Sequence, residues 1–299
     1  MGPSPQPAGV RPEAFIERWA RGDPRMAPHL LLVGRTGSGK TSAAKWIIDY
    51  VCVRKRLARS IVLDWDGEYA GILPFQVFEP PFEVAAIPPL IIDALTEIER
   101  PEEGGHGVAA HLRRILETEG LKDLNRAIAR LRNELTLPRN VADAAASRLE
   151  AVARYITLRE PREVEVADEM EEGVYLLSRI YSIWERASVQ QFLASYYVLT
   201  KCSPVPSILL VEEGGMGARS TFLKHVLALA RRRRTKIIFI SQTLPPPELL
   251  PNFELLLFDC DWRTRRELGA PIPHSPLEPG ECWWVRRAER PLKFRFPSR

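Results

Sequence analysis

Four apolar residues at positions 30–33 run directly into the sequence GRTGSGKT at positions 34–41. Glycines allow a tight loop whose main-chain N–H groups converge on an anion, and a following helix adds the positive end of its dipole. The spacing Gly34-x-x-x-x-Gly39-Lys40-Thr41 is that of a phosphate-binding P-loop. The run SAAKWIIDYV after it is compatible with a helix. The chain is therefore predicted to fold around a strand, a phosphate loop and a helix.

The P-loop pattern assigns roles to its side chains. Lys40 is predicted to reach the β- and γ-phosphates of ATP, and the Thr41 hydroxyl to bind Mg²⁺. A glycine-rich turn with a chance lysine is the alternative, and the strand-like and helix-like runs on either side disfavour it. The other residues predicted to bind the nucleotide are Gly34, Thr36, Gly37, Ser38, Gly39 and Ser42.

Composition limits the class of protein. With 299 residues, 45% of them hydrophobic, the chain can build one large globular domain or two small ones. The net charge of +4 is compatible with a nucleic-acid partner but does not indicate one alone. No apolar run is long enough to cross a bilayer, so a cytoplasmic location is expected, with any membrane attachment through another subunit.

Two residue classes carry weaker signals. The four cysteines form no CxxC pair, which disfavours a structural zinc site. The chain has 34 Arg and 8 Lys but only four Asn and five Gln. Scarce amides fit a thermophilic source, although codon bias also explains the arginines.

Apolar runs and helical periodicity alternate along the chain. This alternation predicts an α/β fold with a mainly parallel sheet. The tail alternates apolar and polar residues around AlaGluArg and is predicted to be a β-hairpin that packs Trp283 and Trp284, in preference to stacking them on bases. The expected strands are 30–33, 60–64, 207–212, 235–241 and 253–259, and the expected helices are 15–21, 40–57 and 219–234.

Between about 90 and 200, apolar residues recur at three- and four-residue spacing, which predicts a helical insertion. Its arginines could face DNA, but a solvated face with salt bridges is favoured. These arginines are Arg113, Arg114, Arg126, Arg130 and Arg132. The predicted segments are an N-terminal extension (1–28), the first part of the core (29–85), the helical insertion (86–203) and the second part of the core (204–299).

Hydrolysis of ATP needs carboxylates, and two apolar runs end in acids: IVLDWDGEY (61–69) and ILLVEEGG (208–215). By residue type, Asp64 is the better single Mg²⁺ candidate. Glu212 and Glu213 offer two adjacent carboxylates, one for the metal and one for the attacking water. Periodicity alone does not choose between the two runs.

The order of these motifs resembles the HerA–FtsK superfamily of hexameric ATPases, and within it the HerA branch and the related conjugation ATPases of type IV secretion. The match comprises GRTGSGKT, LDWDGEY, the helical insertion, ILLVEE and a strand ending in Ser241-Gln242, over about residues 29–296. It implies a RecA-like core and a homohexameric ring that hydrolyses ATP to move DNA, which is expected to be double-stranded and bound without regard to sequence. A nuclease, a membrane channel or a capsid would be the further partner.

The resemblance also implies roles for single residues. Glu213 would be the catalytic carboxylate, Glu212 the acid on the Mg²⁺ side and Gln242 the sensor of the γ-phosphate. One arginine of the run 231–234, with Arg231 and Arg234 the named candidates, would reach the neighbouring subunit's nucleotide. Asp64 would lie near the catalytic centre with the rest of its motif.

The sequence departs from the family pattern in three places. Glu212 stands where the family has Asp, and Gly214 and Asp66 replace two histidines. These changes leave open slow or partner-dependent hydrolysis. The alternative function is an ATP-binding regulatory or assembly ATPase of a secretion or pilus-like machine that moves no DNA. A small-molecule kinase is disfavoured because the insertion is long.

Overall fold

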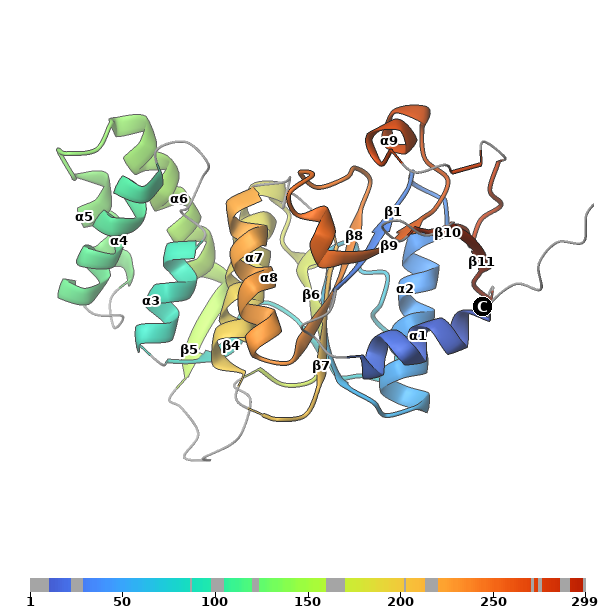
Figure 1. The fold of residues 1–299 in the computed structure, drawn as a ribbon. Coiled ribbons are helices and arrows are strands. Elements are labelled where there is room, and N and C mark those ends of the chain that lie inside the picture. The colour runs from blue at the N-terminus through green and yellow to red at the C-terminus, as the bar shows by residue number, and fades with distance from the viewer. Residues whose placement is uncertain are drawn as a thin grey trace, which may run out of the picture. The chain divides into compact units, whose positions relative to one another are not determined.

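The computed structural model describes residues 11–22, 29–86, 88–97, 105–119, 124–159, 170–201, 203–212, 220–269, 272–273, 276–285 and 291–297 (Figure 1). It divides the chain into two compact units. The P-loop unit comprises Met1–Ser60, Pro206–Leu210 and Lys236–Arg299, and the carboxylate unit comprises Ile61–Val205 and Val211–Thr235. Each unit is therefore assembled from stretches that are far apart in the sequence.

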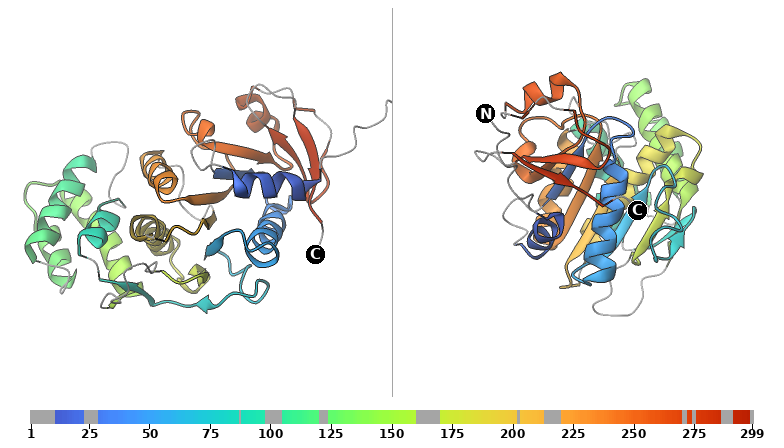
Figure 2. Two further views of the ribbon diagram at one scale, coloured as in Figure 1. Left: turned by 60° about the horizontal axis from the view of Figure 1, so that its bottom comes forward. Right: turned by 90° about the vertical axis from the view of Figure 1, so that its right-hand side faces the viewer.

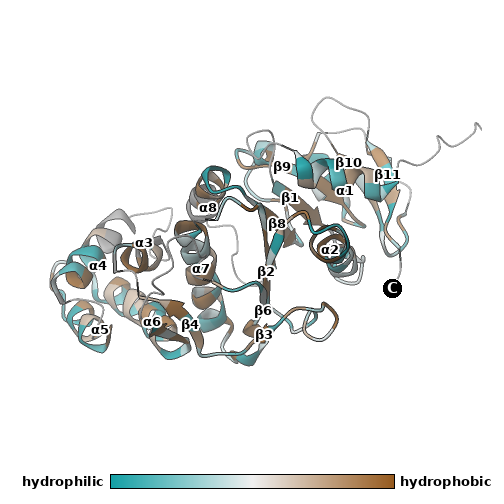
Figure 3. Ribbon diagram, turned by 90° about the horizontal axis from the view of Figure 1, so that it is seen from below, coloured by the Kyte–Doolittle hydropathy of each residue, from teal (hydrophilic) through white to brown (hydrophobic). Residues whose placement is uncertain are grey.

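The strands of the P-loop unit form a mainly parallel sheet. β1 (His29–Val33) pairs in parallel with β8 (Thr235–Ser241) and with β9 (Phe253–Leu257). β1 is buried along its whole length and is coloured hydrophobic over most of it in Figure 3, as expected for a strand with covered faces. β10 (Glu281–Val285) pairs antiparallel with β9 and with β11 (Leu292–Arg295), which makes the predicted C-terminal hairpin (red in Figure 2).

The helices of the P-loop unit match the expected positions, with one change of geometry. The helix after the P-loop is regular only to residue 48, and its last turns are π-helical, with Lys55 donating its N–H to the carbonyl of Tyr50. A short helix after β9, whose N-cap is Asp261, was not predicted. The elements are α1 (Pro12–Arg21), α2 (Lys40–Ile48), η1 (Asp49–Arg54), η4 (Leu250–Asn252) and α9 (Trp262–Glu267).

Aromatic packing joins the hairpin to α1. The ring of Trp284 lies 4.5 Å from that of Phe15 and 5.7 Å from that of Phe294, measured between centroids. The Trp284 indole N–H also donates to the carboxylate of Glu254 at 2.8 Å. The predicted packing role of the tandem tryptophans is thus confirmed for Trp284.

The carboxylate unit also contains parallel strands. β6 (Gly173–Leu176) pairs in parallel with β2 (Arg59–Asp64) and with β3 (Val77–Phe78), and a second sheet joins β4 (Phe82–Ala85) to β5 (Ile156–Arg159). β5 and β6 lie within 86–203, the segment expected to be a helical insertion, so this segment contains two short strands as well as its helices. Both strands have four residues, which is too short for a period to show, and β5 follows directly from a helix. β7 (Ser207–Glu212) begins in the P-loop unit and ends in the carboxylate unit.

The remaining elements of the carboxylate unit are helical. Arg114 pairs with Glu134 at 3.0 Å, Arg132 pairs with Glu150 at 2.8 Å, and Arg113 pairs with Asp93, so the salt-bridged interpretation is confirmed for these three arginines. The helices are α3 (Pro88–Glu97), α4 (Gly105–Glu119), α5 (Leu124–Arg132), α6 (Arg139–Tyr155), η3 (Leu177–Arg179), α7 (Ile183–Thr200) and α8 (Ser220–Arg232). In the described part of the chain, no helix is both long and apolar enough to cross a bilayer.

Candidate functional site

The P-loop unit holds Lys40 against the main chain of the loop that precedes it. Nζ of Lys40 donates to the carbonyls of Gly34 at 2.7 Å and Arg35 at 2.9 Å, and the side chain is buried. Gly37 and Gly39 have φ of 79° and 96°, in the region that favours glycine. The loop thus closes around the ammonium group, where phosphate oxygens can replace the carbonyls as its partners.

Ser38 tests whether this loop fits a phosphate. Its Oγ is buried and has no hydrogen-bond partner among the described residues. A buried hydroxyl without a partner costs about 1–3 kcal/mol, so a ligand that accepts from it would recover that energy. The unpartnered hydroxyl of Ser38 and the geometry of the loop therefore both fit the triphosphate of a nucleotide.

The strand next to the P-loop fixes the first half of the loop. Arg35 donates its N–H to the carbonyl of Asp259 at 2.8 Å, and the two side chains form an ion pair that raises the pKa of Arg35. A Cβ on Gly34 would lie 2.7 Å from Cβ of Phe258, so only glycine fits there. Asp259 was not predicted to take part in the site. Its position two residues after β9, a strand parallel to β1, is a signal that could have pointed to it.

The second half of the loop packs against the turn before β10. Gly280 donates its N–H to the carbonyl of Ser38 at 3.1 Å, and a Cβ on Gly39 would lie 2.5 Å from the nitrogen of Gly280. Around Gly37, by contrast, a Cβ would meet nothing within 4 Å. The C-terminal hairpin therefore forms part of the phosphate site.

Replacing Gly39 by alanine is expected to destabilise the protein by about 2 kcal/mol more than replacing Gly37 does. Both residues have positive φ, so both variants bear the backbone cost of about 1 kcal/mol, but only Gly39→Ala adds a steric clash with Gly280. Urea unfolding followed by tryptophan fluorescence measures both. Equal losses of stability would show that the contact with Gly280 is not made.

In the carboxylate unit, Asp64 organises the turn that follows β2. Its Oδ1 accepts the N–H groups of Gly67 at 2.9 Å and Glu68 at 3.0 Å, and its Oδ2 accepts those of Tyr69 at 3.0 Å and Ala70 at 3.3 Å. Burial raises the pKa of Asp64 although these four donors oppose the shift. With both oxygens engaged in this way, Asp64 is a weaker candidate for direct Mg²⁺ binding than Glu212.

Glu212 ends β7 as a buried carboxyl with few donors. Its Oε2 accepts the N–H of Trp65 at 3.2 Å. Burial, and next the nearby Asp64 carboxylate, raise the pKa of Glu212 to about 8. Burial beside Glu212 also keeps the pKa of the Tyr69 phenol well above its usual value. A divalent cation would stabilise the ionised carboxylate of Glu212. Carboxylate oxygens are ligands that Mg²⁺ prefers, so Glu212 fits a Mg²⁺ site.

The other predicted residues lie at several places. Gln242 is exposed and follows Ser241, whose register partner on β1 is Val33, so Gln242 comes directly after the strand beside the P-loop. Thr41 is half-buried, whereas Thr36 and Ser42 are exposed. Arg231 is half-buried in the last turn of α8, and the arginines at 232–234 are exposed. Glu213, Gly214 and Arg219 lie outside the described residues.

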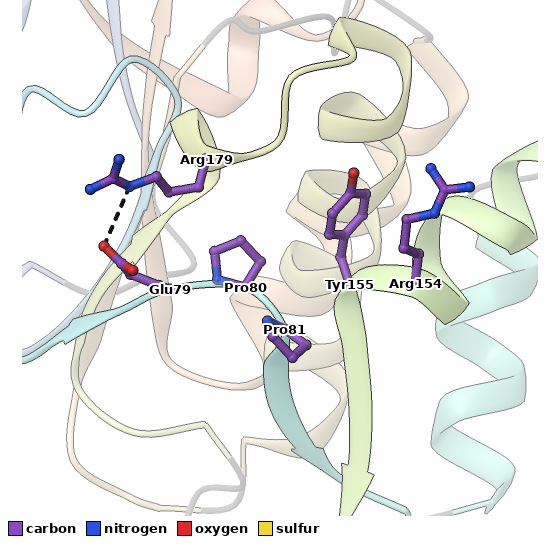
Figure 4. Close-up of a pocket in the computed structure, with 6 residues that line it drawn as sticks. All are labelled: Glu79, Pro80, Pro81, Arg154, Tyr155 and Arg179. Atoms are coloured by element: carbon purple, nitrogen blue, oxygen red, sulfur yellow. Dashed lines mark ion pairs between the residues drawn. The ribbon is translucent and has the colours of Figure 1, made fainter.

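Figure 4 shows a pocket of about 410 Å³ in the carboxylate unit that the sequence did not predict. Arg179 pairs with Glu79 at 3.4 Å, and Arg154 pairs with Glu185 at 2.5 Å. Because each arginine already has a carboxylate partner, the pocket offers no uncompensated charge for a phosphate. It is lined by Glu79, Pro80, Pro81, Arg154, Tyr155 and Arg179.

The described residues form neither a metal-binding cluster nor a disulfide. Within the described ranges, no three His, Cys, Asp or Glu side chains are grouped to hold a metal ion. Cys52, Cys260 and Cys282 are buried and form no disulfide among the described residues, and Cys202 lies outside those ranges.

A family model and several solved structures resemble the chain. Residues 23–136 match the model described as helicase HerA, central domain, so the resemblance to HerA–FtsK ATPases is confirmed for the part that contains the P-loop and the second-strand motif. No curated protein sequence is significantly similar to the chain.

The solved structures share its fold. VirB4 of Thermoanaerobacter pseudethanolicus has a TM-score of 0.64 at 14% identity, over 94% of this chain and 92% of that one. The bacterial conjugative coupling protein TrwBdeltaN70 in complex with sulphate scores 0.53 at 14% identity, over 98% and 88%. TrwB with the non-hydrolysable GTP analogue GDPNP scores 0.55 at 14% identity, over 96% and 85%. The fold is therefore the RecA-like α/β fold that was predicted.

Proposed function

We propose that the protein is an ATP-driven motor of the HerA/FtsK type, which assembles as a ring and moves DNA. The observation that carries the proposal is the closed P-loop, in which Nζ of Lys40 donates to two main-chain carbonyls. This loop lies in a segment that matches the HerA central domain. Similarity in fold to a conjugative coupling protein supports DNA as the cargo.

The proposed chemistry is divided among five residues of one subunit and an arginine of the neighbouring subunit. Lys40 binds the β- and γ-phosphates, and Thr41 and Glu212 hold Mg²⁺, which neutralises phosphate charge when bound. Glu213 accepts a proton from the attacking water, and Gln242 contacts the γ-phosphate. An arginine of the run 231–234 completes the site of the neighbouring copy.

The proposed DNA contact is made to phosphates. Such contacts are independent of sequence, and the affinity should fall steeply as the salt concentration rises. Four consecutive arginines at 231–234 supply more positive charge than the end of one helix needs, which supports the role proposed above for one of them at the neighbouring copy's nucleotide.

A second candidate function is an ATPase that regulates the assembly of a secretion or pilus-like machine without moving DNA. The specific observation in its favour is Glu212, since a buried glutamic acid with a pKa of about 8 is protonated at neutral pH until a cation arrives. Hydrolysis would then be slow and would depend on assembly with a partner.

ATP turnover with and without DNA separates the two functions. For a DNA motor, we expect turnover that rises on addition of double-stranded DNA, together with a six-fold ring in electron micrographs of the ATP-bound protein. Turnover that ignores both double- and single-stranded DNA, with negligible DNA binding at low salt, would favour the assembly ATPase. A monomer without nucleotide-dependent DNA binding would exclude the motor.

Glu213→Gln is expected to keep ATP binding and to lose turnover by about 100-fold, because glutamine cannot accept the proton. Phosphate release gives the rate and calorimetry gives the affinity. Glu248→Gln, the same change at an exposed position of the P-loop unit, is the control and should leave both unchanged. Full turnover in Glu213→Gln would show that another group acts as the base.

A further inference from the structure

α7 carries a glutamine where an apolar residue would be expected. Gln190 is completely buried, and its Oε1 has no hydrogen-bond partner among the described residues. An unsatisfied amide oxygen in the interior costs about 1–3 kcal/mol. Leucine has nearly the same volume without that cost, so packing alone does not account for a glutamine at this position.

The other end of the same amide contacts the acidic site, which comprises Glu212 and the turn at 65–70. Nε2 of Gln190 donates to the main-chain carbonyl of Glu212 at 2.9 Å. This bond fixes the last peptide of β7, from which the Glu212 side chain projects and to which Glu213 is joined.

Arg186, one helical turn before Gln190, contacts the other side of the site. Its Nη1 donates to the carbonyl of Trp65 at 3.0 Å, and its guanidinium lies 4.9 Å from the centre of the Trp65 ring. Nε and Nη2 both donate to the carbonyl of Ile180, at 3.1 and 2.9 Å. The N–H of Trp65 is the donor to the Glu212 carboxylate. Arg186 therefore holds Trp65 in place, and Trp65 in turn donates to the carboxylate of Glu212.

We propose that Arg186 and Gln190 are positioning residues for Glu212. Residues four apart lie on the same face of a helix, so α7 presents both side chains to the acidic site together. Gln190 holds the main chain of Glu212, and Arg186 holds its hydrogen-bond donor, Trp65. The inference rests on the proposed function, in which Glu212 is the acid on the Mg²⁺ side.

Gln190→Leu tests the proposal against a matched control in the next residue. Gln191 is also buried on α7 and makes no described contact with Glu212, so Gln191→Leu is the same chemical change without the proposed effect. Loss of a group that orients a metal-binding side chain typically costs about 10- to 100-fold in activity. We expect Gln190→Leu to lower kcat by about tenfold or more, with KM for ATP and the melting temperature close to those of Gln191→Leu.

A second measurement needs neither metal nor turnover. Amide hydrogen exchange at Trp65, followed by NMR in the nucleotide-free protein, reports on the bond to Glu212. Gln190→Leu and Arg186→Lys should each speed this exchange by about tenfold, whereas Gln191→Leu should not. Lysine keeps the charge of Arg186 but cannot reach both carbonyls in the same way.

The two measurements separate the failure of each idea. If Gln190→Leu and Gln191→Leu behave alike in both kcat and exchange, the positioning role is wrong while the ATPase proposal stands. If the wild-type protein hydrolyses no ATP, the proposed function is wrong, and the exchange rate at Trp65 alone decides whether Arg186 and Gln190 order Glu212.

Discussion

Lys40→Ala is expected to abolish ATP turnover, with a loss of about 1,000-fold or more, and to weaken nucleotide binding. Nζ of Lys40 is the cation that the loop holds at its centre, 2.7 and 2.9 Å from two main-chain carbonyls. Removing a preorganised donor from a site of developing negative charge costs about 100- to 1,000-fold, and the ground-state phosphates lose their cation as well. Phosphate release gives kcat, and calorimetry with a non-hydrolysable ATP analogue gives the affinity.

Lys45→Ala is the matched control, because Lys45 lies on the same helix and is half-buried. It should retain turnover within a few-fold of the wild type. Melting temperatures of both variants show whether either change unfolds the P-loop unit. If Lys40→Ala turned over ATP within tenfold of the wild type while folded, the phosphate site would have to lie elsewhere.

The parts of the fold that sequence predicted are those with strong local signals. β1, β7 and β8 are apolar runs of five to seven residues beside loops or helices, so their type and limits were clear from the chain itself. The glycines at 34, 37 and 39 with Lys40 likewise specify a loop within a few residues. The hairpin was recognisable from its alternation on both sides of a turn.

The parts that escaped prediction depend on contacts between distant residues. β6 is a strand because it pairs with β2, and four residues carry no period that could reveal this. Gly280 and Asp259 contact the P-loop through main-chain groups, which every residue has, and the ion pair of Asp259 with Arg35 joins residues far apart in the sequence. Residue type therefore carried no local signal for either residue. Gln190 reaches Glu212 only because α7 packs beside β7.

Asp64 and Glu212 show what residue type alone leaves open. A carboxylate after a buried strand is the expected sign of a metal ligand, and the sequence left Asp64 and Glu212 as alternatives. The structure engages both oxygens of Asp64 with four main-chain N–H groups, whereas the Glu212 carboxylate accepts one main-chain N–H, from Trp65. What separates the two acids is the conformation of the turn at 65–70, which Gly67 with φ of 80° allows.

Glu212→Gln is expected to stabilise the protein at alkaline pH and to remove much of its pH dependence. The pKa of Glu212 is about 8 in the folded protein against an ordinary 4.5, so the folded state binds the proton more tightly than the unfolded state does. The free energy of unfolding therefore falls as the pH rises from about 4.5 to about 8 and levels off above that. Glutamine is neutral throughout, and it should exceed the wild type by roughly 4 kcal/mol at pH 9 and come close to it near pH 5.

Urea unfolding between pH 5 and pH 9, with EDTA and without nucleotide, measures this difference. Some pH dependence should remain in Glu212→Gln, because burial also raises the pKa of Asp64. Glu134→Gln is the control of opposite sign: a hydrogen bond from Thr136 and the charge of Arg114 lower the pKa of Glu134, so that variant should lose stability at neutral pH. If Glu212→Gln were instead less stable than the wild type at pH 9, the carboxylate of Glu212 would have compensating donors in the metal-free protein, and its burial would not favour cation binding.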